Sequence, residues 1–119
     1  NILSAPLDAE FYDDFGRLSI KRVAAYVGEP VERFAKMVGM TGSGLRKNPV
    51  SQMVQAPGRR FVWILGRLER ELGSKKVALM WLRTPDPALE EKSALELLAQ
   101  GEFAPVEWLL HAMTTGTPI

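Results

Sequence analysis

Few side chains in this sequence could do acid–base or metal chemistry. His111 is the only histidine in 119 residues, and cysteine is absent. The nearest acid, Glu107, lies four residues earlier, a spacing that places both side chains on one face of a helix. A general base or a metal ligand needs several converging partners, so this pair is more simply a surface or interface contact. The sequence therefore predicts a protein that is not an enzyme and holds neither a metal nor a cofactor.

Two further patterns imitate functional sites. The glycine-rich run 39–44 resembles the start of a phosphate-binding loop, but that motif requires lysine after its last glycine, where this chain has Leu45. No strand precedes the run, so we interpret it as a turn. The acidic residues of the last third indicate a solvated face rather than a matched acid and base. These acids are Glu90, Glu91, Glu96, Glu102 and Glu107.

The formal net charge of +1 hides a strong segregation of charge along the chain. Residues 1–16 hold four acids and no base, residues 17–76 hold thirteen Lys and Arg against four acids, and residues 77–119 hold two bases against six acids. A basic middle is typical of a surface that meets nucleic-acid phosphates. The alternative is an ordinary solvated helical surface.

Helical periodicity prevails throughout, and the sequence predicts an all-α fold. The expected helices cover about 8–15, 19–27, 30–38, 42–48, 58–72, 75–83, 94–100 and 103–114. Ser19 and Ser74 are suited to capping helix starts, and Ser93 with Glu96 forms a capping box. The stretch 49–58 contains two prolines and is the expected hinge. We therefore expect an N-terminal lobe, residues 1–56, packed on a small helical C-terminal lobe, residues 57–119.

The N-terminal lobe contains a pattern typical of a DNA-binding helix-turn-helix. Such a motif has a small residue in its first helix, a glycine in the turn and an apolar residue in the second helix; Ala35, Gly39 and Leu45 stand at these positions. The alternatives are a helical hairpin that merely packs and a decayed motif kept as scaffold. The residues expected to face DNA are Thr41, Ser43, Arg46, Lys47 and Asn48, with Arg59 and Arg60 on the phosphate backbone.

The C-terminal third carries the most specific signal. A helix ending in Trp81-Leu82 is followed by a loop with two prolines, a short Leu-Leu helix that stops at Gly101, and a last helix with a glycine near its end. Residues 77 to 116 thereby resemble the toxin-binding domain of the Xre/MbcA/ParS antitoxins, with a departure at Ala94, where that family usually has proline.

The resemblance implies the antitoxin of a type II toxin–antitoxin system. Its partner would be a RES-domain toxin that degrades NAD or uses it for ADP-ribosylation, and the antitoxin would occlude the toxin's active site and bind its own operator. The alternative is a stand-alone helix-turn-helix transcriptional regulator. By position, the toxin-binding residues would be Trp108, His111, Ala112, Thr115, Gly116, Thr117, Pro118 and Ile119.

The apolar stripe of the last helix consists of Val106, Leu109, Leu110 and Met113. Trp108 lies off its centre, so it is either a core side chain or an interface anchor. We also expect a homodimer that contacts through helix 58–72, since helix-turn-helix proteins commonly read two half-sites. No run of about 18 apolar residues or signal peptide is visible, so no membrane association and a cytoplasmic location are expected.

Overall fold

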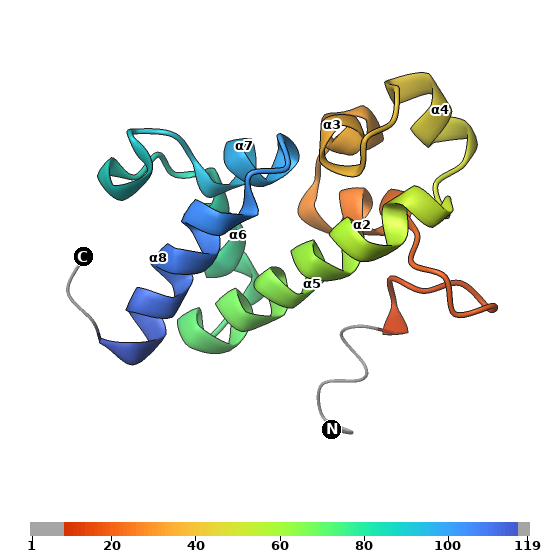
Figure 1. The fold of residues 1–119 in the computed structure, drawn as a ribbon. Coiled ribbons are helices and arrows are strands. Elements are labelled where there is room, and N and C mark those ends of the chain that lie inside the picture. Colours follow the sequence, from red (N-terminus) through yellow and green to blue (C-terminus); the bar gives the residue numbers. More distant parts are fainter. Residues whose placement is uncertain (1–8, 117–119) are drawn as a thin grey trace. The chain divides into compact units, whose positions relative to one another are not determined.

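The computed structural model describes residues 9–116, and over this range the protein is all-α, as the sequence predicts (Figure 1). The elements in chain order are α2 (Ile20–Val27), the 3₁₀ turn η1 (Val31–Phe34), α3 (Ala35–Val38), α4 (Gly42–Lys47), α5 (Gln52–Leu72), α6 (Lys75–Arg83), the 3₁₀ turn η2 (Pro87–Leu89), α7 (Ala94–Ala99) and α8 (Phe103–Thr115). Contacts divide the chain into two compact units, unit 1 (Asn1–Trp63) and unit 2 (Ile64–Ile119).

Local capping sets several helix ends where the sequence predicts them. The Ser19 hydroxyl accepts a hydrogen bond from the backbone N–H of Arg22 at the start of α2, and Ser74 caps α6 in the same way. Ser93 and Glu96 form the complete capping box at the start of α7. These bonds satisfy N–H groups that the first helical turn leaves without partners, so they depend only on neighbouring residues.

The helix expected over 8–15 is wrong for most of its length. Residues 12–18 instead form a turn closed by an antiparallel bridge between Tyr12 and Leu18. One oxygen of the Asp13 carboxylate accepts hydrogen bonds from the backbone N–H groups of Phe15 and Arg17, each at 2.9 Å. The other oxygen accepts from Nε of Arg17 at 2.8 Å. This side-chain acceptor competes with helical hydrogen bonding, and Gly16 adopts a positive φ of 78° that ends the turn.

Acid should loosen this turn. The hydrogen bond from the backbone N–H of Arg17 is the main cause that lowers the pKa of the Asp13 carboxyl, and the Arg17 side chain lowers it further, partly opposed by desolvation. A lowered pKa in the folded state contributes stability above the unfolded pKa, and this contribution is lost as the pH falls through the folded value. We expect an NMR titration to place the pKa of Asp13 below the ordinary aspartate range. Arg17→Gln should raise this pKa only part of the way, because the backbone N–H of residue 17 remains, and an unchanged value would contradict the role of the Arg17 side chain.

The hinge expected over 49–58 is also wrong, because α5 begins at Gln52 and continues through Pro57. An internal proline costs a helix about 3 kcal/mol. The helix nevertheless continues because its inner face is buried on both sides of the proline: Val54 and Phe61 are at most 1% exposed. The boundary expected between residues 56 and 57 thus falls inside a helix.

Unit 1 has an aromatic and aliphatic core, and the buried polar side chain of Gln55 ties the N-terminal segment to it. The rings of Phe34 and Phe61 meet edge to face with centroids 5.3 Å apart. Gln55 is 6% exposed; its carbonyl oxygen accepts from the N–H of Leu18 at 2.8 Å, and its amide donates to the Leu18 carbonyl at 3.0 Å. The Leu18 side chain also packs closely against Gly58, where an added Cβ would lie 2.7 Å from it. Gln55 and Gly58 therefore fix the N-terminal segment against α5.

Unit 2 buries the inner faces of its helices around Leu98, which is fully buried. Helix α7 contacts both α6 and α8, and η2 also contacts α8 (Figure 1). The loop after η2 is closed by a bridge between Asp86 and Lys92. These contacts hold α8 by one side and leave its other side to solvent.

Candidate functional site

Helix α8 presents an exposed stripe that we call the α8 outer face, made of Ala104, Trp108, His111 and Thr115. The spacing of four, three and four residues places these side chains on one side of a helix. The opposite side is buried, as the sequence predicts for Val106, Leu109 and Leu110. Burial of that apolar side determines which residues face outward.

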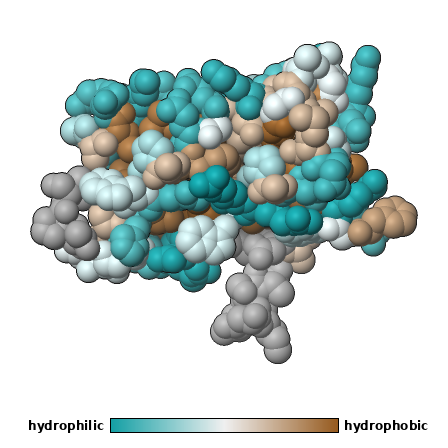
Figure 2. Space-filling view, viewed as in Figure 1, coloured by the Kyte–Doolittle hydropathy of each residue, from teal (hydrophilic) through white to brown (hydrophobic). Residues whose placement is uncertain are grey.

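Trp108 is the dominant group of the α8 outer face. Its side chain is 53% exposed, so it is not a core residue of this chain. On the face that Figure 2 shows, hydrophilic side chains break up the apolar surface. A large exposed aromatic on a packed helix suits an anchor at a protein interface, because it buries much area at little conformational cost.

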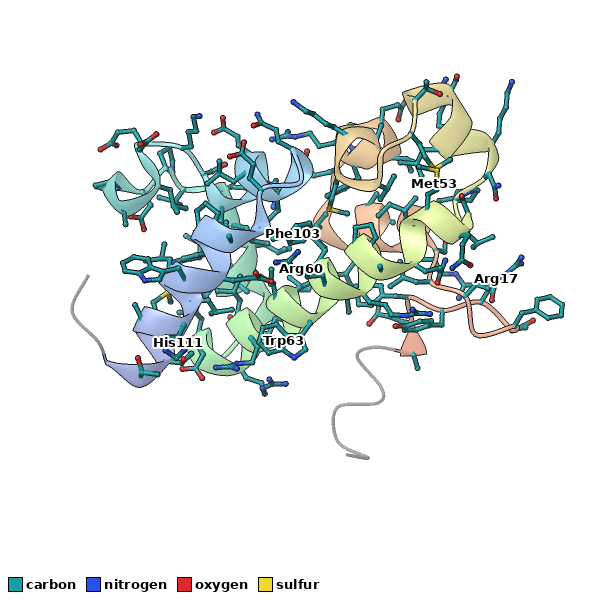
Figure 3. All side chains as sticks on the ribbon, in the orientation of Figure 1. Arg17, Met53, Arg60, Trp63, Phe103 and His111 are labelled. Carbon is teal, nitrogen blue, oxygen red and sulfur yellow. The ribbon has the colours of Figure 1, made fainter. Side chains whose placement is uncertain are left out.

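His111 is exposed on the same face, as Figure 3 shows on α8. Its backbone carbonyl accepts hydrogen bonds from the hydroxyls of Thr114 and Thr115, at 3.0 and 2.9 Å. Helix α8 ends at Gly116, which has the left-handed φ of 72° typical of a helix stop. The end of the helix is therefore set locally, directly before the tail that the family resemblance implicates.

One residue expected to bind the toxin does not lie on this surface. Ala112 is 4% exposed and packs inside unit 2, because it follows the buried Leu109 by three residues on the same side of the helix. Thr117, Pro118 and Ile119, also expected to bind the toxin, lie outside the described residues. The structure thus brings together Trp108, His111 and Thr115, with Gly116 at the helix end.

A second candidate surface lies on unit 1, around the short helix α4. Gly39 takes a φ of 75° in the turn before it, and the Thr41 hydroxyl caps it by accepting from the N–H of Gly44 at 3.0 Å. Leu45 is fully buried, as expected for the residue that packs back. The glycine-rich run is thus a turn leading into a helix. The residues exposed on and after α4 are Ser43, Arg46, Lys47 and Asn48.

Arg46 forms an ion pair with Glu32 of the 3₁₀ turn η1. Its Nη1 lies 2.5 Å from an oxygen of the Glu32 carboxylate on η1. Their side chains are 52% and 46% exposed. The pKa of Glu32 is lowered, first by a hydrogen bond from its own backbone N–H and then by the Arg46 side chain.

Arg59 and Arg60 are also exposed, on α5 of the same unit, with Trp63 one turn further along (Figure 3). Trp63 is 54% exposed. The dimer contact expected through helix 58–72 stays a prediction, but the apolar side of this helix is buried within one chain, so such a contact would use its exposed side chains. The residues of the apolar side, Phe61, Val62, Ile64, Leu65 and Leu68, are at most 3% exposed.

Sequence reasoning missed two features of these units. The Arg46–Glu32 pair joins residues fourteen positions apart, for which no sequence pattern exists. A hollow of about 300 Å³ lies beside η2. Next to it, Glu90 and Glu91 have positive φ values of 57° and 65°. The lining residues of the hollow are Ala88, Leu89, Glu90, Lys92, Leu97, Glu102 and Pro105. Such a hollow depends on how η2, α7 and α8 pack, and local sequence does not encode that packing.

Within residues 9–116, no group of three or more acidic or histidine side chains could hold a metal ion. No helix in this described range is both long enough and apolar enough to cross a bilayer. No protein-family model matches the chain, and neither a curated protein nor a solved structure shows significant similarity to it. The candidate surfaces therefore have to be judged by their own chemistry.

Proposed function

We propose that this protein is an antitoxin that neutralises a RES-domain toxin by covering the toxin's active site with the α8 outer face and the tail that follows it. The proposal rests on the family-like pattern of residues 77 to 116 together with one observation, the 53% exposure of Trp108. A tryptophan left in solvent on a helix that is otherwise well packed is explained by a partner that covers it. The protein itself would act in the cytoplasm without a cofactor.

Co-expression tests this proposal directly. The full chain would be produced together with its proposed RES-domain partner, with an affinity tag on that toxin alone. We expect the chain to co-purify in fixed stoichiometry and to stop the toxin's consumption of NAD. Purification of the toxin alone, still fully active in the presence of excess chain, would contradict the proposal.

We further propose that unit 1 binds operator DNA, so that the antitoxin represses its own operon. The exposed Arg46 and Lys47 at the end of α4, with Arg59 and Arg60 on α5, support this because phosphate contacts by Lys and Arg supply most sequence-independent affinity. The same observation favours the second candidate function, a stand-alone transcriptional regulator. The two differ in whether a toxin binds the α8 outer face.

The α4 cations should determine the salt dependence of DNA binding. Replacing both Arg46 and Lys47 with alanine should make the plot of log affinity against log salt shallower by about one unit, since each lost phosphate contact removes about one. Fluorescence anisotropy with a labelled duplex measures this slope. Lys75→Ala/Lys76→Ala on α6 removes the same charge and should leave the slope nearly unchanged. Equal slopes for both double variants would refute the α4 assignment.

We also propose a homodimer, since two half-sites on DNA call for two copies of the motif. Because the apolar side of α5 is buried, the contact would have to use exposed side chains such as Trp63. Light scattering at tens of micromolar should give twice the monomer mass of 13.2 kDa. Trp63→Ala should shift the mass toward the monomer.

A further inference from the structure

The arginines of unit 1 differ in the side chains that they contact. Ion pairs with carboxylates join Arg17 to Asp13, Arg33 to Glu29, and Arg46 to Glu32. The first two pairs join residues four positions apart along the chain. The third pair joins two different elements, η1 and α4, and engages the arginine that stands at the exposed end of α4.

The packing of η1 on α4 brings Glu32 to Arg46. Gly42, at the first position of α4, lies so close to Glu32 that an added Cβ would meet the Glu32 Cγ at 3.1 Å. The backbone of α4 can approach η1 because this position lacks a side chain. The Glu32 carboxylate then reaches Nη1 of Arg46, one helical turn further along.

A carboxylate in this place imitates a DNA phosphate. Both are anionic oxygen acceptors that a guanidinium binds through charge-assisted hydrogen bonds. A phosphate approaching Arg46 must compete with Glu32 for Nη1, and it also meets the negative charge of Glu32 itself. A guanidinium carries five N–H donors, so a single hydrogen bond to Glu32 leaves other donors of Arg46 available for a base edge. The same bond holds the Arg46 guanidinium in a defined place.

We propose that Glu32 is a positioning residue that suppresses sequence-independent DNA binding by occupying Arg46. With Glu32 present, Arg46 contributes little to contacts with arbitrary duplex and is oriented for a base edge. Without it, Arg46 becomes one more phosphate-binding cation. This inference rests on the proposed DNA-binding role of α4, and it assigns to that surface a residue outside α4.

The matched comparison is Glu32→Gln against Glu29→Gln. Both variants remove one negative charge from the same part of unit 1 and both release an arginine, but only Glu32→Gln releases Arg46. The Arg46–Glu32 pair is exposed, and such pairs stabilise a fold by about 0–1 kcal/mol, whereas the Glu29 side chain is only 13% exposed. Circular dichroism therefore has to verify the fold of both variants before binding is compared. A random-sequence duplex is the probe, with anisotropy measured from 50 to 200 mM salt.

Glu32→Gln should steepen the salt slope by about one unit, so that affinity falls about fourfold more across this range than for Glu29→Gln. Adding Arg46→Gln to Glu32→Gln should restore the slope of the unaltered protein. Equal slopes for the two single variants would overturn the role of Glu32. If the unaltered protein binds the duplex and only the Arg46/Lys47 double variant weakens this binding, the role of Glu32 is refuted but DNA binding by α4 is not. If no variant binds duplex even at 50 mM, the DNA-binding proposal fails with it.

Discussion

Replacing Trp108 with alanine should weaken the complex with the toxin about thirtyfold and leave the thermal midpoint of the free protein almost unchanged. Truncating an aromatic anchor at an interface typically costs about 2 kcal/mol or more, and 1.4 kcal/mol corresponds to a factor of ten. The side chain is 53% exposed in the free chain, so its loss leaves no internal cavity. Titration calorimetry of the complex and a thermal melt of the free variant measure the two effects separately.

Met80→Ala is the matched control for this experiment. Met80 is 60% exposed on α6 of the same unit, but it is not part of the α8 outer face. We expect Met80→Ala to keep full affinity for the toxin. If Trp108→Ala instead lowers the midpoint of the free protein and leaves toxin binding intact, Trp108 has a structural role and the α8 outer face is not the contact.

Gln55→Met should destabilise the protein by about 3 kcal/mol, the second large effect that we expect. Methionine matches the length of glutamine but offers neither the acceptor nor the donors that Gln55 gives to the backbone of Leu18. The N–H and the carbonyl of Leu18 would then lie in the interior without these partners, and each such group costs about 1–3 kcal/mol. Chemical denaturation with tryptophan fluorescence provides the measurement.

Gln52→Met on the same helix is the control, because Gln52 is exposed and no buried backbone group depends on it. Its free energy of unfolding should change by less than about 0.5 kcal/mol, as is usual for surface substitutions. A similar small change for Gln55→Met would mean that water or a backbone shift replaces the Gln55 hydrogen bonds, and that the N-terminal segment is not held by this side chain.

The expected helix over 8–15 and the expected hinge over 49–58 failed for different physical reasons. At residues 8–15 the failure is local: Asp13 offers its own acceptor to nearby N–H groups, a competition that helical periodicity does not register. At 49–58 the failure is tertiary. Pro57 and Gly58 argue for a break, yet the buried Val54, Gln55 and Phe61 keep the segment helical, and Gly58 is used for the close approach of Leu18.

The all-α class, the capped ends of α2, α6 and α7, and the segments that carry the candidate surfaces could be predicted from the sequence alone. Those features depend on residues within a few positions of one another, and hydrogen bonds at caps and glycine stops are equally local. The side of α8 that faces solvent depends instead on tertiary packing. That helix is apolar on most of its circumference, so its periodicity leaves Trp108 and Ala112 ambiguous, and packing against α7 and η2 exposes the first and buries the second. The pairing of Arg46 with Glu32 likewise required the packing of η1 on α4. Contacts between distant segments follow from how the whole chain excludes water, and no short pattern encodes them.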